Sequence, residues 1–405
     1  MMLNFRNCCK KINFCLIFCL IFVIPFSTAV GSFISLLILM FFVINGNYKE
    51  QITKLKNNNV ILALVLFTTL HLIGLLWSQD MESGVNILKK QWKFLLVPIL
   101  MLYIRKEYQS YYIYTFIVAM SISVLFSYGI WFEIISPVKY STIHNPTPFM
   151  SHVTYNPLLS VAIYFVASYA ISTEKHSTTI KITHILLFIS MSINMFITGG
   201  RSGQIMFFFS LVLIIFQYLK YSILTKIVSS IALFLVAFSI AYSISDTFED
   251  RINNAAHGIM HFELDSDYSV SYNTTTRIAW TINGFYIFAD YPLFGVGTGD
   301  LRSAMDVEIK SNSPSLSSTD NPHNMYILVL VQFGIIGMLS LLYIFYTQIK
   351  FSIANNDAVV RRIGTGLPIL FIIANFAESY LSVHATSLFY SVITAVIYTD
   401  LDSRT

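Results

Sequence analysis

The chain has 405 residues, of which 55% are hydrophobic and only 11% are charged. Soluble domains carry about 25% charged residues, and a soluble fold could not bury this much apolar surface, because its exterior must face water. The composition therefore excludes an ordinary soluble protein and favours one that lies in a lipid bilayer. The net charge of +4 is too small to indicate a nucleic-acid partner, and none is expected.

Apolar runs recur along the chain and are separated by short polar segments. A helix needs roughly 20 apolar residues to cross the hydrocarbon core of a bilayer. The fourth run is short, and its helix is expected to begin earlier, near Val85. We predict an all-α integral membrane protein with about twelve transmembrane helices, at residues 12–26, 28–44, 60–77, 92–104, 111–132, 152–172, 182–198, 203–219, 223–244, 323–347, 363–377 and 384–400.

The distribution of Lys and Arg predicts the orientation of these helices. With the N-terminus in the cytoplasm, 16 of the 25 Lys and Arg fall on the cytoplasmic side, in very short loops, and 9 fall outside. Positive residues concentrate in cytoplasmic loops of membrane proteins. We therefore expect both termini to be cytoplasmic.

The first run is typical of either a signal peptide or an uncleaved anchor. We favour the anchor, because the apolar pattern resumes almost immediately after Pro25. No disulfide framework is predicted, since the only cysteines lie in this N-terminal region, at Cys8, Cys9, Cys15 and Cys19.

One long segment interrupts the pattern of short loops. Residues 1–244 carry the first nine predicted spans, and residues 323–405 carry the last three and a cytoplasmic tail. Between them, residues 245–322 form a polar outer loop. A loop of this length inside a compact protein is usually functional. Two helices are predicted in it, at about 247–262 and 276–289.

The second loop helix has a threonine N-cap at Thr274, Thr275 or Thr276 and stops before Pro292. Its apolar face suits either a helix that lies on the membrane surface or one that caps the bundle.

The residues after this helix predict a close backbone contact. Three glycines occupy alternate positions in residues 291–299, which indicates a turn where the backbone approaches another segment. The Ser/Asn/Pro-rich residues 311–321 are expected to be mobile.

Arg201 is the first candidate site residue. It lies between glycine pairs in the break between two spans, and a guanidinium at a membrane boundary needs an anionic partner. Open glycine N–H groups and the positive end of the next helix dipole favour a phosphate there. The alternative is an arginine that extends to lipid headgroups. Arg277 is a weaker candidate alone, and Arg251 and Arg302 are weaker still.

His323 is the second candidate site residue. Asn321 is expected to cap the tenth span with Pro322 at its first position, which places His323 in the first turn. The helix dipole disfavours an imidazolium there, and a neutral imidazole that faces an outer cavity is a competent general base. The alternative is a histidine that only caps the helix or lies at the membrane interface.

Other kinds of site are not evident in the sequence. No group of His, Cys, Asp or Glu has metal-ligand spacing, so neither a metal nor another cofactor is expected. Charged residues are nearly absent from the predicted spans, which argues against an ion channel or a proton-coupled pump.

Five short motifs are more informative together than separately. Their order, and the layout of twelve spans with a long outer loop before the last three, resemble the bacterial O-antigen ligases and the related polymerases of the same superfamily. The resemblance covers the chain from about residue 130 onward. The motifs are TGGRSGQ at 198–204, TRIAW at 276–280, YPLFGVG at 291–297, PHNMY at 322–326 and VQFGIIG at 331–337.

The resemblance implies a membrane glycosyltransferase of the GT-C type in the bacterial inner membrane. Such a ligase is metal-independent and transfers a glycan from undecaprenyl diphosphate to a sugar hydroxyl of lipid A–core on the periplasmic face. By match to the motifs, His323 would be the general base, and Arg201 and Arg277 would hold the diphosphate. Arg302 lies where the family often has a further arginine. Asn321 and Asn324 would support His323.

Three other functions remain open. A polymerase would use a second lipid-linked glycan as acceptor, and the sequence does not separate it well from a ligase. A protein O-glycosyltransferase is a third enzyme. A transporter or flippase would be expected to show inverted repeats or broken helices with charges inside the membrane, and the sequence indicates neither.

Overall fold

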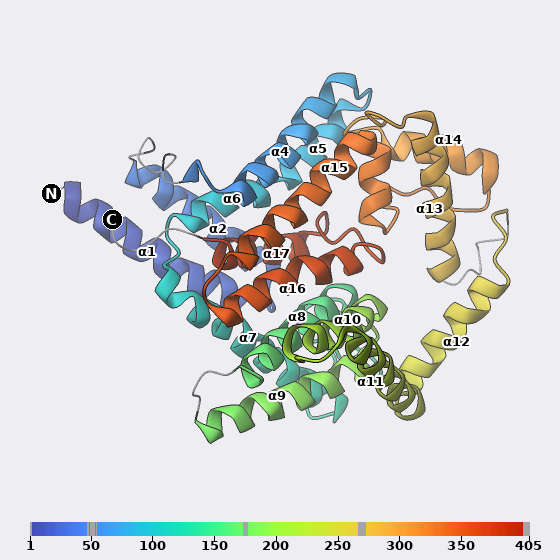
Figure 1. Ribbon diagram of the computed structural model, residues 1–405. Coiled ribbons are helices and arrows are strands. Elements are labelled where there is room, and N and C mark those ends of the chain that lie inside the picture. The colour runs from blue at the N-terminus through green and yellow to red at the C-terminus, as the bar shows by residue number, and fades with distance from the viewer. Residues whose placement is uncertain are drawn as a thin grey trace.

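A computed structural model describes residues 2–46, 48, 53, 55–172, 177–265 and 273–399. Helices dominate these residues and no strand occurs among them, which confirms the all-α fold class (Figure 1). The predicted cytoplasmic tail and part of the long outer loop lie outside the described residues.

Each of the first nine predicted spans coincides with helical segments. The fourth differs from the prediction, because a polar, amphipathic helix precedes the apolar one and the two separate at Gln91. The helices are α1 (Met2–Val23), α2 (Thr28–Asn45), α4 (Asn59–Ile73), η1 (Gly74–Trp77), α5 (Met81–Lys90), α6 (Trp92–Met101), η2 (Lys106–Tyr108), α7 (Gln109–Trp131), α8 (His152–Ala170), α9 (Thr178–Ile197), α10 (Arg201–Tyr218) and α11 (Ile223–Ile244).

The described part of the long outer segment contains three helices, one more than predicted. The third, α14, was missed because it is largely polar, although Leu301, Met305 and Ile309 share a buried face at helical spacing. The helices from here on are α12 (Asp246–Met260), α13 (Asn273–Asp290), α14 (Leu301–Asn312), α15 (Met325–Ile353), α16 (Ala358–Ala374) and α17 (His384–Ile397).

One local prediction in the outer segment was wrong. The helix α13 already contains Thr274, Thr275 and Thr276, so none of them is its N-cap. The residues after α14 pack against α13. Ser313 and Leu316 are buried, and the Trp280 indole N–H donates to the carbonyl of Ser317 at 3.0 Å.

Eight helical segments of the described chain are long and apolar enough to cross a membrane. The helices α6, α16 and α17 have 10, 17 and 14 residues. A 14-residue helix is only about 21 Å long, which is less than the roughly 30 Å of a hydrocarbon core. The count of twelve therefore stays a prediction. The eight segments are α2, α4 with η1, η2 with α7, α8, α9, α10, α11 and α15.

The bundle has buried helices at its centre and exposed apolar helices around them. α8 packs between α9 and α10 and is almost entirely buried, whereas α11 is almost entirely exposed. Figure 1 shows α12, α13 and α14 together at one end of the molecule, with α1 at the opposite end. The three helices of the outer segment thus lie together beyond one end of the bundle.

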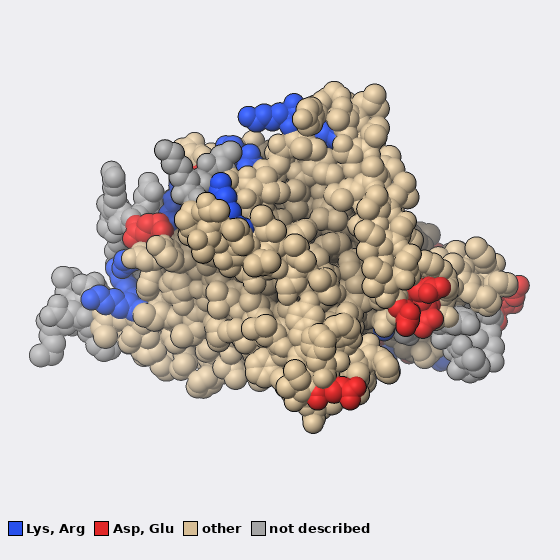
Figure 2. Space-filling view, turned by 90° about the horizontal axis from the view of Figure 1, so that it is seen from below, with Lys and Arg blue, Asp and Glu red and all other residues tan. Residues whose placement is uncertain are grey.

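The surface has a composition suited to lipid. The middle of the face in Figure 2 carries no charged side chain, and the visible Lys, Arg, Asp and Glu lie toward its edges. On α11, side chains such as Val228, Ile231 and Leu235 are more than half exposed. Large apolar side chains exposed over a whole helix mark an interaction surface, here the membrane.

α15 is broken at Gly334, which has φ 59° and ψ −151°. The sequence did not indicate a broken span. The break carries no charged residue, and residues 291–299 satisfy the backbone groups that it frees. The bonds run from Val296 N to Val331 O at 2.9 Å, from Gly297 N to Gln332 O at 2.9 Å and from Ile335 N to Pro292 O at 2.8 Å.

The glycines of residues 291–299 make the predicted close contact. A Cβ on Gly295 would lie 2.4 Å from the backbone of Gln332, and one on Gly299 would lie 2.0 Å from the carbonyl oxygen of Asp80. Gly295 and Gly297 also have positive φ, which glycine adopts at no steric cost. The segment holds α15 against the residues after α4, so this motif is structural.

Candidate functional site

His323 lies just outside α15 and not in its first turn. The helix begins at Met325, and its N-cap is Asn324, whose side chain accepts from Tyr326 N at 3.0 Å and Ile327 N at 3.3 Å. The predicted cap at Asn321 was therefore wrong. His323 has φ +52°, a conformation that is uncommon for residues other than glycine and persists only where neighbours impose it.

Asn321 helps to impose this conformation. Its side-chain oxygen accepts from His323 N at 3.0 Å, and its amide nitrogen donates to Glu378 Oε1 at 2.9 Å. Thr319 in turn accepts from Asn321 N at 3.0 Å and donates to the Asn321 carbonyl at 2.7 Å. Asn321 thus bonds to both His323 and Glu378.

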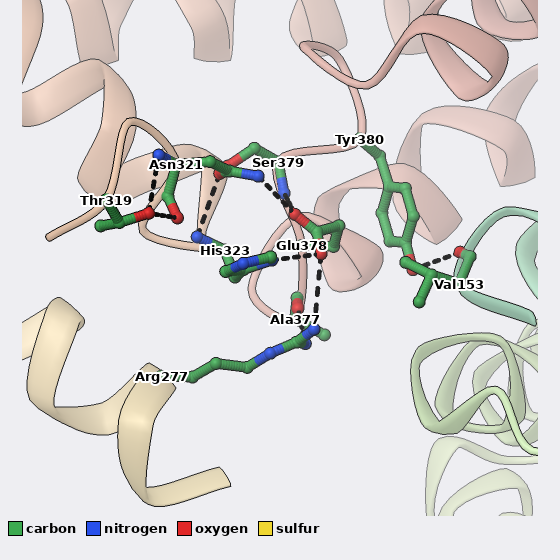
Figure 3. Close-up of polar contacts among 9 residues, drawn as sticks. All are labelled: Val153, Arg277, Thr319, Asn321, His323, Ala377, Glu378, Ser379 and Tyr380. Carbon is green, nitrogen blue, oxygen red and sulfur yellow. Dashed lines mark hydrogen bonds and ion pairs between the residues drawn. The ribbon is translucent and has the colours of Figure 1, made fainter. Parts of the chain in front are cut away.

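Glu378 is the principal residue that the sequence analysis missed. It lies in the turn between α16 and α17, is only 2% exposed, and accepts a 2.6 Å hydrogen bond from His323 Nδ1 (Figure 3). Further donors are Asn321, the Ser379 N–H at 3.0 Å and Arg277 at 3.4 Å. A buried carboxylate is tolerable only with such partners.

These donors keep Glu378 ionised. Burial raises the pKa of its carboxyl, but the hydrogen bonds from His323 and Asn321 and the charge of Arg277 hold the pKa below its usual range. An ionised carboxylate can only accept, so His323 Nδ1 carries the proton and donates. The other ring nitrogen, Nε2, is then the one available to accept a proton.

The turn that carries Glu378 is held on both sides. Met325 N donates to the carbonyl of Asn375 at 2.8 Å, and the Tyr380 hydroxyl donates to the carbonyl of Val153 at 3.1 Å. The turn is thereby bonded to α15 and α8. The ring of His323 is also stacked on Trp280 of α13, with centroids 5.3 Å apart and planes at 23°.

Arg277 lies in the first turns of α13 and contacts the same turn. It donates to the carbonyl of Ala377 at 2.6 Å and forms an ion pair with Glu378 Oε2 at 3.4 Å (Figure 3). The structure thus brings Arg277 beside His323, in agreement with the motifs. Part of its hydrogen-bonding capacity is already used by the protein.

Arg201 begins α10 and is half-buried. It donates to the hydroxyl of Thr274 at 2.7 Å and has no acidic partner among the described residues. The glycines beside it are less open than predicted. Gly199 N donates to Asn145 Oδ1 at 2.9 Å, and a Cβ on Gly203 would lie 2.3 Å from Asn156. These glycines are therefore required for close packing, in addition to any role in binding a ligand.

His323, Arg201 and Arg277 lie at the junction of two cavities. One cavity of about 600 Å³ is lined mainly by apolar side chains of α10, α11, α12 and α13. The other, of about 180 Å³, is more polar and is also lined by His152, Arg251 and Trp280. The same three residues line both cavities. The arrangement suits a ligand with an apolar part and a polar part.

Two other expectations concern Arg302 and a metal. Arg302 is exposed on α14 and lines neither cavity, so the structure does not bring it to the other site residues. Within the described ranges, no three His, Cys, Asp or Glu side chains are grouped so that they could hold a metal ion.

Comparison with known proteins matches part of the chain to a family. The family model described as O-antigen ligase matches residues 186–342. This part of the chain is similar to the O-antigen ligase family. The match confirms the resemblance seen in the motifs and includes Arg201, Arg277 and His323, whereas Glu378 lies beyond it. No curated protein matches the chain.

Glu378 was missed by the sequence analysis and Arg251 was named only as a weak candidate, because neither belongs to a motif. Glu378 follows an apolar run directly, and its polar neighbourhood, Asn375 to Ser379, was the available signal. Arg251 lies on an amphipathic helix of the outer segment, and only its place in the fold distinguishes it from a surface arginine.

Proposed function

We propose that the chain is a glycosyltransferase of the O-antigen ligase type, acting on a lipid-linked donor. The observation that carries this proposal is the junction of an apolar and a polar cavity at His323, Arg201 and Arg277. The apolar cavity suits the undecaprenyl chain of the donor, and the two arginines suit its diphosphate. The family match supports an activity of ligase or polymerase type.

In the proposed reaction, a sugar hydroxyl of lipid A–core attacks the anomeric carbon of the donor glycan. Nε2 of His323 takes the hydroxyl proton, a new glycosidic bond forms, and the bond from the anomeric carbon to the diphosphate oxygen breaks. The electron pair of that bond leaves with undecaprenyl diphosphate. Arg201 and Arg277 stabilise the negative charge that develops on the leaving oxygen.

Glu378 has two tasks in this proposal. Its carboxylate fixes the tautomer of His323, so that Nε2 faces the acceptor as the base. It also stabilises the imidazolium that forms when Nε2 takes the proton. We propose that no metal is needed, because the arginines stabilise the charge on the leaving diphosphate, which in other enzymes a metal ion does.

The setting of the reaction is part of the proposal. We place the chain in the bacterial inner membrane with twelve spans, a GT-C type fold, cytoplasmic termini and the junction facing the periplasm. A reporter active only in the periplasm should be active when fused after residue 265 and silent after residue 355. The reverse pattern would place His323 on the wrong side for the donor.

Deletion of the gene tests the reaction through the lipopolysaccharide. A ligase predicts loss of all O-antigen from the core and accumulation of lipid-linked polymer. A core that carries a single repeat unit indicates the alternative, a polymerase that uses a second lipid-linked glycan. Unchanged lipopolysaccharide with altered glycoproteins indicates a protein O-glycosyltransferase. Accumulation of the donor on the cytoplasmic face indicates a flippase.

A further inference from the structure

Arg251 is held in place by the start of α12. The Ser245 hydroxyl donates to the carbonyl of Phe196 at 2.7 Å. Phe248 is buried, with its ring centroid 5.5 Å from that of Phe196 and 5.4 Å from that of Phe238. These contacts fix the first turn of α12 to α9 and α11, and Arg251 follows Phe248 by three residues, nearly one helical turn.

α12 contributes to both cavities. Its apolar side chains Phe248, Ile252 and Ala255 line the large apolar cavity, whereas Arg251 lines the small polar one. The guanidinium therefore lies on the polar side of the junction, in the cavity that Arg201 also lines.

The glycine-rich motif makes room for this side chain. A Cβ on Gly199 would lie 2.3 Å from a terminal nitrogen of Arg251. The φ of Gly199 is not in the left-handed region, so space and not backbone conformation requires glycine there. The guanidinium of Arg251 is thus seated against the same motif that carries Arg201.

The three arginines that line the polar cavity differ in how their charge is balanced. Arg277 is paired with Glu378, Arg201 bonds only to the neutral hydroxyl of Thr274, and Arg251 has no hydrogen bond or ion pair within the described residues. Partly buried cations without counter-charges favour an anion between them. The polar cavity therefore holds two cations whose charges the described protein leaves unbalanced.

We propose that Arg251 is a third diphosphate-binding residue, and that Arg201 and Arg251 together neutralise the donor's two phosphates. In a diphosphate esterified at both ends, each phosphate carries one negative charge, which matches two unbalanced arginines. Arg277 contributes less net charge to the diphosphate, because it is already paired with Glu378. This inference rests on the proposed function and assigns a role to a residue outside the five motifs.

The test compares two apolar probes that differ in their head group. Undecaprenyl diphosphate and the uncharged undecaprenol are titrated onto purified enzyme in detergent. Arg251→Gln should weaken binding of the diphosphate about 10- to 100-fold, the effect of losing a charge-assisted hydrogen bond, and leave undecaprenol binding unchanged. Arg302→Gln, which removes an exposed arginine, is the matched control and should change neither.

A second variant tests the position of the guanidinium without removing its charge. Gly199→Ala places a methyl group where Arg251 now lies and should also weaken binding of the diphosphate. If the parent binds undecaprenyl diphosphate and either Arg251→Gln or Gly199→Ala binds it equally well, the inference is overturned and the proposed function stands. If the parent itself binds undecaprenyl diphosphate no better than undecaprenol, the proposed function fails.

Discussion

The two sides of the junction handle their polar groups in opposite ways. On the side formed by residues 319–323 and 377–379, the polar side chains bond mainly to one another, and Glu378 accepts from four donors. On the side formed by the starts of α10 and α12, Arg201 and Arg251 have no acidic partner among the described residues.

In the proposed mechanism, this difference separates a positioned base from charges that bind the ligand. A closed hydrogen-bond network fixes His323 before any substrate binds, so no reorganisation is needed when the proton moves. Arginines without protein counter-charges gain their partner only when an anion arrives. Substitutions on the first side should therefore alter rate more than donor affinity, and substitutions on the second side should alter both.

The largest expected effect is on rate, from His323→Ala. Loss of a general base typically lowers the rate about 10²- to 10⁴-fold. Donor affinity should change little, because the arginines remain. Transfer of a labelled glycan and binding of the lipid-linked donor, measured on the purified variant, separate the two quantities.

His323→Asn is the matched control, since asparagine keeps hydrogen-bonding capacity and tolerates positive φ but cannot take a proton at pH 7. A normally expressed His323→Asn variant with near-parental transfer would refute the base assignment.

Arg201→Ala should have the next largest effect, a fall in kcat/KM of about 100-fold, because a half-buried cation that contacts the diphosphate is lost. In contrast to the His323 variants, KM for the donor should rise as well. Arg201→Lys should restore little, because an ammonium does not reproduce the bidentate guanidinium. Steady-state kinetics of the parent, Arg201→Ala and Arg201→Lys measures both quantities. A fall in kcat with no rise in KM would mean that Arg201, like His323, affects the rate and not donor binding.

Glu378→Gln should lower kcat by about tenfold, as expected for loss of one charged hydrogen bond to the base, with KM for the donor unchanged. The imidazole remains but its tautomer is no longer fixed. The measurement is kcat and KM for the donor, with Arg302→Ala as the control variant. A rise in KM without a fall in kcat would mean that Glu378 serves donor binding instead.

The same variant predicts a pH dependence of stability. The pKa of Glu378 lies below its usual range in the folded protein, so its ionised form stabilises the fold fully above the unfolded pKa of about 4.3. That contribution is lost as the pH falls through the lower, folded pKa. The difference in unfolding temperature between the parent and Glu378→Gln should therefore shrink as the pH is lowered below about 4.

The smallest expected effect comes from metal removal. If fixed arginines balance the leaving group, excess EDTA should leave transfer by the purified enzyme unchanged. If EDTA abolishes the activity and Mg²⁺ or Mn²⁺ restores it, the proposal that arginines alone stabilise the leaving group is wrong.

Local sequence was sufficient to place most helices. Each predicted apolar run corresponds to helical residues, because the apolar composition of a segment is enough to predict a helix in the membrane. Prediction from local sequence failed where tertiary contacts determine the structure. α14 is stabilised by a buried face and not by overall hydropathy, and the break at Gly334 exists because residues 291–299 bond to it.

The site shows the same division. The motifs identified His323, Arg201 and Arg277, which the structure brings together. They did not identify Glu378, which reaches His323 only after α15 and α16 have packed against each other, 55 residues apart in sequence. Arg302 was named from motif order alone, whereas Arg251 lines the polar cavity together with Arg201. The reason is that α12 packs against α9 and α11, while α14 packs against α13 and α15.

The break in α15 also has a consequence for the order of assembly. The hydrogen-bond partners that join the backbone of residues 291–299 to other helices come from Gly74 and Ser78 on one side and from residues 331–335 on the other. During synthesis the first set emerges long before the second. Residues 291–299 can complete these contacts only once residues 331–335 have been made, so a chain that stops before residue 331 lacks the second set of partners.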